Sequence, residues 1–138
     1  MDGQRYAGGC FCGAIRYEVS GAARTLCYCH CQSCRRAAGA PLVAWATFER
    51  TQLHVSRGTL AEHRSSAGVV RGFCASCGSA LTYRNEGRAA DIDITLASLD
   101  EPALLVPRMH MWVQDKLPWL SITDGLPQYP AGLTDEAG

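Results

Sequence analysis

Two short cysteine motifs indicate how the chain folds: Gly9-Cys10-Phe11-Cys12-Gly13 near its start and Phe73-Cys74-Ala75-Ser76-Cys77-Gly78 near its middle. Residues two apart on extended backbone point to the same side, and a Cys-x-x-Cys turn brings two sulfurs toward one point. Each stretch can therefore offer two thiolates to one ion, and a structural zinc ion takes four ligands in a tetrahedron. The sequence predicts one zinc site that joins the start of the chain to its middle. Its ligands are Cys10, Cys12, Cys74 and Cys77.

A second group of cysteines lies between these pairs, in the stretch Cys27-Tyr28-Cys29-His30-Cys31-Gln32-Ser33-Cys34. Cys29, Cys31 and Cys34 lie on a turn that leads into a short predicted helix. Three protein ligands and an exchangeable fourth position are typical of a catalytic zinc site, where a thiol substrate would bind as thiolate. Cys27 leaves two alternatives open, because it is either a small buried residue or a fourth thiolate that would close the site.

Composition and charge argue against nucleic-acid-binding and membrane proteins. Thirteen basic residues balance thirteen acidic ones, so no net field attracts nucleic acid or anionic lipid, and neither is an expected partner. The chain has no apolar run of signal-peptide or membrane-span length, so we expect a cytoplasmic protein. Cytosolic thiols stay reduced, which favours metal binding over disulfides for the eight cysteines. Residues 134–138 form a polar tail that we expect to be disordered.

Short apolar segments, separated by glycine, cysteine and proline, predict a mostly β fold. In the clearest of them Ile15, Tyr17 and Val19 alternate with polar residues, the period-two pattern of a half-buried strand. Further strands are predicted in residues 42–48, 53–55, 69–73 and 92–96. Residues 33–38 alone are expected to be helical, because Gly39 and Pro41 end the segment. The prolines after residue 101 indicate loops and short strands in the last third of the chain.

Together these motifs resemble the glutathione-dependent formaldehyde-activating (GFA) family, also called the centromere-protein-V/GFA domain. The resemblance covers about residues 8–130 and has the family's order and spacing. The stretches that carry it are Gly9-Cys10-Phe11-Cys12-Gly13, Cys29-His30-Cys31-Gln32-Ser33-Cys34-Arg35-Arg36, Phe73-Cys74-Ala75-Ser76-Cys77-Gly78-Ser79, and His110-Met111-Trp112 through Lys116-Leu117-Pro118-Trp119. The resemblance implies a β-tent (Mss-four-like) fold of coiled antiparallel sheets around a structural zinc, in a single domain over residues 1–138. It also implies a second, catalytic zinc on Cys29, Cys31 and Cys34.

The activity that the resemblance implies is that of a carbon–sulfur lyase, an S-(hydroxymethyl)glutathione synthase that joins glutathione to formaldehyde. Glutathione is then the expected co-substrate, and a small thiol and an aldehyde are the expected partners. Cys27 is an addition to the family's motif, so the second site could be closed by a fourth sulfur. The alternative function is a non-enzymatic zinc module that binds a protein partner. The sequence leaves the physiological substrate and the oligomeric state open.

Several other residues are candidates for the chemistry at the second zinc. Three thiolates leave that centre with net negative charge, so a nearby cation would help both the incoming thiolate and an oxyanion. Arg35 and Arg36 are candidates for that field or for binding a glutathione carboxylate, unless they form a solvated helix face. Lys116 belongs to the same candidate binding set, and His110 is either a proton donor or a packed histidine. His30 should point away from the metal. Trp45, Trp112 and Trp119 are expected in the core or in a pocket wall.

Overall fold

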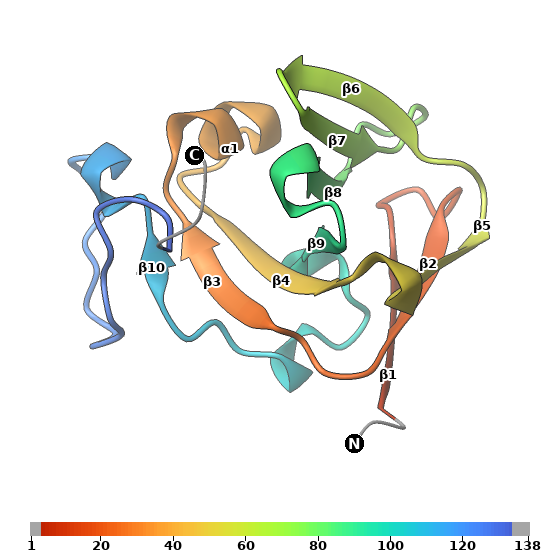
Figure 1. Ribbon diagram of the computed structural model, residues 1–138, viewed down its shortest axis with the longest axis horizontal. Coiled ribbons are helices and arrows are strands. Elements are labelled where there is room, and N and C mark those ends of the chain that lie inside the picture. Colours follow the sequence, from red (N-terminus) through yellow and green to blue (C-terminus); the bar gives the residue numbers. More distant parts are fainter. Residues whose placement is uncertain (1–3, 134–138) are drawn as a thin grey trace.

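The computed structural model describes residues 4–133, in which ten β-strands form two sheets beside one α-helix (Figure 1). The predicted mostly β class is confirmed. The finer β-tent assignment stays a prediction, and the expected disorder of residues 134–138 lies outside the described part of the chain.

The smaller sheet has three antiparallel strands in the order β1-β2-β5. Its strands are β1 (Arg5–Gly9), β2 (Arg16–Ser20) and β5 (Leu53–Arg57). The predicted alternation holds in β2, where Tyr17 and Val19 are buried and Glu18 is exposed. The apolar face of this sheet therefore packs into the core, as the period-two pattern indicated.

The larger sheet has seven strands in the order β10-β3-β4-β9-β8-β7-β6. These are β3 (Thr25–Cys29), β4 (Val43–Glu49), β6 (Ala61–Ser66), β7 (Val69–Phe73), β8 (Ala80–Asn85), β9 (Asp91–Thr95) and β10 (His110–Met111). One pair departs from the expected antiparallel sheets, because β10 runs parallel to β3. After β9 the chain passes two 3-10 helices, Leu96–Ser98 and Pro102–Leu104, before it reaches the outer side of β3.

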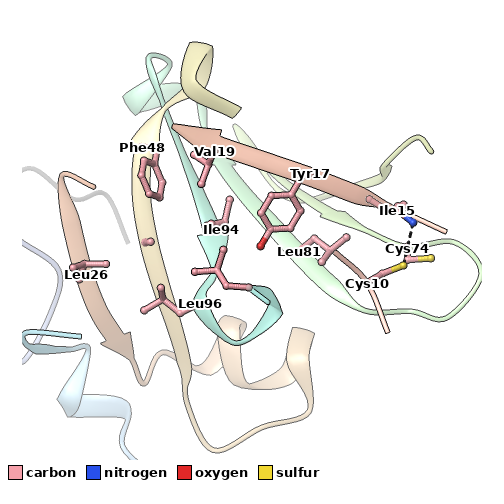
Figure 2. Close-up of a cluster of buried hydrophobic side chains, with 12 residues drawn as sticks. Cys10, Ile15, Tyr17, Val19, Leu26, Phe48, Cys74, Leu81, Ile94 and Leu96 are labelled. Atoms are coloured by element: carbon pink, nitrogen blue, oxygen red, sulfur yellow. Dashed lines mark hydrogen bonds between the residues drawn. The ribbon is translucent and has the colours of Figure 1, made fainter. Parts of the chain in front are cut away.

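The two faces of the seven-stranded sheet meet different surroundings. On one face Leu26, Phe48 and Ile94 pack with Tyr17 and other residues in the largest apolar cluster (Figure 2). The opposite face lines a cavity. The side chains that alternate with the core residues along these strands point into it: Cys27, Trp45, Thr47, Asp93 and Tyr83. Because the cavity covers the second face of the sheet, Asp93 of β9 is buried as well as Ile92 and Ile94.

The predicted helix is present as α1 (Gln32–Ala38). Cys31 is its N-cap, and Gly39 ends it in the left-handed conformation, with φ of 64°. The remaining 3-10 helices are Arg50–Gln52, Glu86–Arg88 and Val113–Asp115. Among the described residues, every helix is too short or too polar to cross a bilayer.

Candidate metal centres and the adjoining cavity

Four cysteine sulfurs meet where two distant turns lie side by side. Cys10 and Cys12 come from the turn between β1 and β2, and Cys74 and Cys77 from the turn between β7 and β8. The four sulfurs lie within 4.8 Å of one another, with Cys12 Sγ 3.7 Å from Cys10 Sγ and 3.8 Å from Cys74 Sγ. A tetrahedron with Zn–S distances of about 2.3 Å has edges of about 3.8 Å. This cluster can therefore hold a metal ion, and its spacing suits zinc.

Local backbone structure fixes these turns. The N–H group of Gly13 donates to the carbonyl of Cys10 at 3.2 Å, and that of Gly78 to the carbonyl of Cys74 at 2.7 Å. Both glycines have positive φ, 83° and 81°, which a residue with a Cβ atom adopts at a cost. The N–H group of Cys77 also donates to the sulfur of Cys74 at 3.4 Å. Such donors stabilise a thiolate over a thiol.

Ser79 connects the two turns directly. Its hydroxyl accepts a hydrogen bond from the N–H group of Phe11 at 2.9 Å and lies 3.0 Å from the sulfur of Cys77. The hydrogen bond from Ser79 lowers the pKa of Cys77 to about 5. The side chain of Phe11, between the two ligands of the first turn, is 94% exposed and contributes little to the core.

The sulfurs of Cys29, Cys31 and Cys34 form a second group within 4.8 Å of one another. Cys29 ends β3, Cys31 caps α1 and Cys34 lies in its first turn, so a short segment of chain supplies all three. Contact with the Cys29 and Cys34 thiols holds the pKa of Cys31 far below its usual range, while contact with Cys31 raises the pKa of Cys29. The trio can hold a metal ion and leaves a tetrahedral ion one position for another ligand.

Cys27 lies on the same face of β3 as Cys29 and lines the same cavity. Its side chain is buried, at 6% exposure. Among residues 4–133, its sulfur does not join the three that lie within 4.8 Å of one another. The structure thus favours the first of the two alternatives, a buried residue in the cavity floor.

The three-sulfur group opens into a cavity of about 400 Å³, within the range of small-molecule sites. Cys29, Cys27 and Thr25 follow one another along β3 and all line it, so its floor runs for about 13 Å at about 3.3 Å per residue. Its apolar walls are Trp45, Val69, Tyr83, Met111, Trp112 and Leu133. A ligand with its sulfur at the trio would therefore lie along the face of the large sheet.

Paired charges lie farther along this floor. Arg24 forms an ion pair with Asp91, and Arg88 contacts Asp91 at 3.5 Å and Asp93 at 3.2 Å. Asp93 is buried and accepts a hydrogen bond from the hydroxyl of Thr47 at 2.7 Å. Burial raises the pKa of Asp93, against the opposing effect of Arg88.

The cation next to the three sulfurs is Arg71, on β7. Both of its terminal nitrogens lie 3.8 Å from the sulfur of Cys34, and its guanidinium carbon lies 5.0 Å from the centre of the Tyr83 ring. Sequence reasoning missed this residue, because Val69-Val70-Arg71 carries no motif. A possible signal was the alternation along β7, which places Arg71 opposite the core-facing neighbours Val70 and Gly72.

The basic residues that the sequence suggested lie elsewhere. Arg35 donates from Nε to the carbonyl of His30 at 3.3 Å, and Arg36 is exposed. Lys116 donates to two backbone carbonyls of the loop that follows it, at 3.2 and 2.6 Å. These three residues are not among those that line the cavity. Their roles in binding substrate stay predictions.

Two histidines from distant segments meet in the interior. His30 Nε2 lies 2.8 Å from His110 Nδ1, and His110 Nε2 lies 2.8 Å from a carboxylate oxygen of Asp124. The bond from His110 lowers the pKa of Asp124, and burial lowers the pKa of His30. Among the described residues, the buried Nδ1 of His30 has no hydrogen-bond partner. His110 does not line the cavity, and its role as proton donor stays a prediction.

The tryptophans divide between wall and surface. Trp45 and Trp112 line the cavity, as expected. Trp119 is 71% exposed, so its expected place in the core or pocket wall is wrong. It follows Pro118 in a segment outside the sheets, which leaves its ring in solvent.

The sequence profile of the family described as "Glutathione-dependent formaldehyde-activating enzyme" matches residues 5–115. The chain belongs to this family. The GFA match spans every cysteine of both clusters, and it confirms the resemblance inferred from the motifs.

Two further proteins are similar to this GFA-family chain. An uncharacterized lyase of Schizosaccharomyces pombe is 28% identical over 78 residues, which are 56% of this chain and 56% of the relative. The chain thus matches about half the length of that curated relative. A Rhodobacter sphaeroides protein of known crystal structure has a TM-score of 0.58 and 21% identity, covering 89% of this chain and 98% of that one. At this identity the likeness concerns the fold alone.

Proposed function

We propose that the chain is a zinc-dependent carbon–sulfur lyase of the GFA type, which makes or breaks the adduct of a small thiol with an aldehyde. The observation that carries this proposal is the group of three cysteine sulfurs at a cavity of about 400 Å³. Membership of the GFA family and the lyase name of the Schizosaccharomyces pombe relative support the reaction class.

The two cysteine clusters would hold one zinc ion each. Cys10, Cys12, Cys74 and Cys77 fit a structural ion, and Cys29, Cys31 and Cys34 fit a catalytic one. When bound at the second centre, zinc would lower the pKa of a substrate thiol there. Three sulfur ligands leave room for that thiol, whereas a closed site would not.

The residues around the second centre would hold the reactants together. In the reaction, the thiolate sulfur forms a bond to the aldehyde carbon, and the electron pair of the broken C=O π bond moves to oxygen. The thiol has released its proton to solvent, and the alkoxide takes one back from solvent. The product is a hemithioacetal, which is a hydroxymethyl thioether when the aldehyde is formaldehyde, and the reverse sequence is the lyase direction. Trp45 and Trp112 wall the cavity and would help to hold the reactants in line.

Glutathione and formaldehyde are the substrates that we propose first. The family's description names them. Three extended residues span about 10–11 Å, and the floor of the cavity runs for about 13 Å from the cysteines. Because the sulfur of glutathione is on its central residue, one arm of the tripeptide can lie along the face of the sheet while the sulfur is near Cys34. The cytoplasmic location and the absence of a nucleic-acid partner remain predictions.

The test is the rate of glutathione–formaldehyde adduct formation, measured by NMR exchange spectroscopy with zinc-loaded protein. We expect the wild-type chain to accelerate exchange and Cys34→Ser, as matched control, to return it to the uncatalysed rate. An unchanged rate with wild-type protein would exclude these substrates. Zinc analysis and X-ray absorption on the same samples separate the enzyme from the non-enzymatic module, because a second zinc with four protein sulfurs favours the module.

A further inference from the structure

Arg71 differs from the other arginines of the cavity in its partners. Arg24 and Arg88 each pair with carboxylates of β9. Arg71 forms no ion pair with a carboxylate within residues 4–133, although it lines the same cavity. A guanidinium always carries its positive charge, so this one can act on the cysteine sulfurs and on a ligand in the cavity.

Three contacts fix the orientation of this guanidinium. Its Nε donates to the hydroxyl of Ser65 at 3.3 Å, and its plane lies over the ring of Tyr83. Both terminal nitrogens face the sulfur of Cys34 at 3.8 Å. The contacts to Ser65 and Cys34 use three of the five N–H groups of the guanidinium, so two N–H groups remain for a ligand. Because both terminal nitrogens lie 3.8 Å from a sulfur of the trio, the two remaining N–H groups are close to the second centre.

We infer that Arg71 binds an anionic oxygen close to the substrate sulfur, and that it is thereby a catalytic residue. The inference rests on the proposed function, in which the alkoxide forms on the carbon that bears the sulfur. A fixed cationic donor next to that carbon stabilises the oxygen only after it becomes charged. Arg71 supplies the cation that a centre of three thiolates needs, and the side chains of Arg35 and Arg36 lie outside the cavity.

The test measures binding without turnover. Zinc-loaded protein is titrated calorimetrically with thioglycolate and with 2-mercaptoethanol, two thiols whose oxygen lies two carbons from sulfur and is charged only in thioglycolate. The quantity of interest is the ratio of their dissociation constants. Because a charge-assisted hydrogen bond contributes about 1.5–3 kcal/mol, we expect Arg71→Met to shift this ratio by about 10- to 100-fold toward 2-mercaptoethanol.

Two further variants sharpen the result. Arg71→Lys keeps the charge without the planar fork, and we expect it to retain part of the preference. Arg64→Met is the matched control, because Arg64 lies on the neighbouring strand β6, is exposed and pairs with Glu86. It removes a positive charge without touching the cavity, and its ratio should equal that of the wild type.

The outcomes separate this inference from the proposed function. If the ratio of the two dissociation constants in Arg71→Met equals that of the wild type, the inferred role of Arg71 is wrong. The proposed function would still stand in that case, because the protein binds thiols. Wild-type protein that binds neither thiol overturns both. If Arg71→Met fails to take up zinc, Arg71→Lys decides, because a ratio unchanged from wild type contradicts the need for a guanidinium. With glutathione and 2-mercaptoethanol as substrates, Arg71→Met should lower kcat for both, whereas a binding site for a glutathione carboxylate would affect glutathione alone.

Discussion

Cys31 has two structural roles at once. As the N-cap of α1 it has extended backbone, and its sulfur accepts a hydrogen bond from the N–H group of Cys34 at 3.3 Å. The same sulfur belongs to the group of three that can hold a metal ion. Helix formation therefore brings two of the three sulfurs together, and the centre and the helix stabilise each other.

Tyr17 gives a prediction at the residue scale. Its ring is 3% exposed, its hydroxyl lies 2.6 Å from that of Ser98, and burial raises its pKa to about 12. Since the unfolded pKa is about 10, its contribution to stability is complete below pH 10 and is lost as pH rises through 12. Tyr17→Phe should lower the free energy of unfolding by about 1 kcal/mol at pH 8. This deficit should shrink by pH 11, because phenylalanine cannot ionise on unfolding.

Urea denaturation of both proteins at pH 8, 10 and 11 measures the difference. The exposed Tyr129 serves as control, and Tyr129→Phe should lower the free energy of unfolding little at pH 8. A constant deficit for Tyr17→Phe would contradict the assigned pKa.

His110 gives a second prediction. Both of its ring nitrogens have partners, one in His30 and one in Asp124. His110→Asn should lower the free energy of unfolding by about 2–3 kcal/mol, because it leaves the buried ring of His30 without its partner. Asp124→Asn keeps an acceptor oxygen and should cost less. A large fall in kcat at unchanged stability and zinc content would instead support His110 as the proton donor.

At the scale of elements, the sequence predicted what depends on neighbours in the chain. The alternation in β2 and the glycine after α1 are local signals, and so are the two pairs and the trio of cysteines. The place of Arg71 depends on the pairing of β7 with β8, which sets it opposite Tyr83. The burial of Asp93 depends on the cavity over β9. Alternation along a single strand indicates which face a residue lies on but not what that face meets, because both features arise from strands that meet only in the fold.

The turn between β7 and β8 allows a test of backbone conformation. Gly78 has φ of 81°, and open space surrounds the position of an added Cβ atom. Gly78→Ala should therefore lower stability by about 1–2 kcal/mol through backbone strain alone. Gly78→Asn is the matched control and should cost less, because asparagine adopts this conformation more readily. Thermal unfolding of the zinc-loaded proteins measures the stability of the wild type and both variants. An alanine variant as stable as the wild type would show that the positive φ at this position causes no strain.

At the scale of the whole molecule, the two cysteine clusters differ in what they connect. The four-sulfur cluster joins the β1–β2 turn of the small sheet to the β7–β8 turn of the large one. The three-sulfur group lies within the segment from β3 to α1. Closing a long loop removes more freedom from the unfolded chain than closing a short one. The first cluster should thus govern stability, and the second should govern activity.

Two cysteine variants test this division. Binding of a structural zinc contributes about 10–16 kcal/mol in small peptides, as much as the entire stability of a typical domain. Cys74→Ser should therefore lose one zinc and unfold both sheets at room temperature. Cys34→Ser should also lose one zinc but remain folded, because its partner ligands lie close by in the chain. Zinc analysis measures the loss of the ion, and circular dichroism measures the loss of structure. A folded Cys74→Ser would contradict the role of the four-sulfur cluster in stability.

If the chain is a single domain, as predicted, wild-type unfolding is one transition by every probe. Separate transitions for the two sheets would contradict the coupling of the sheets through this cluster.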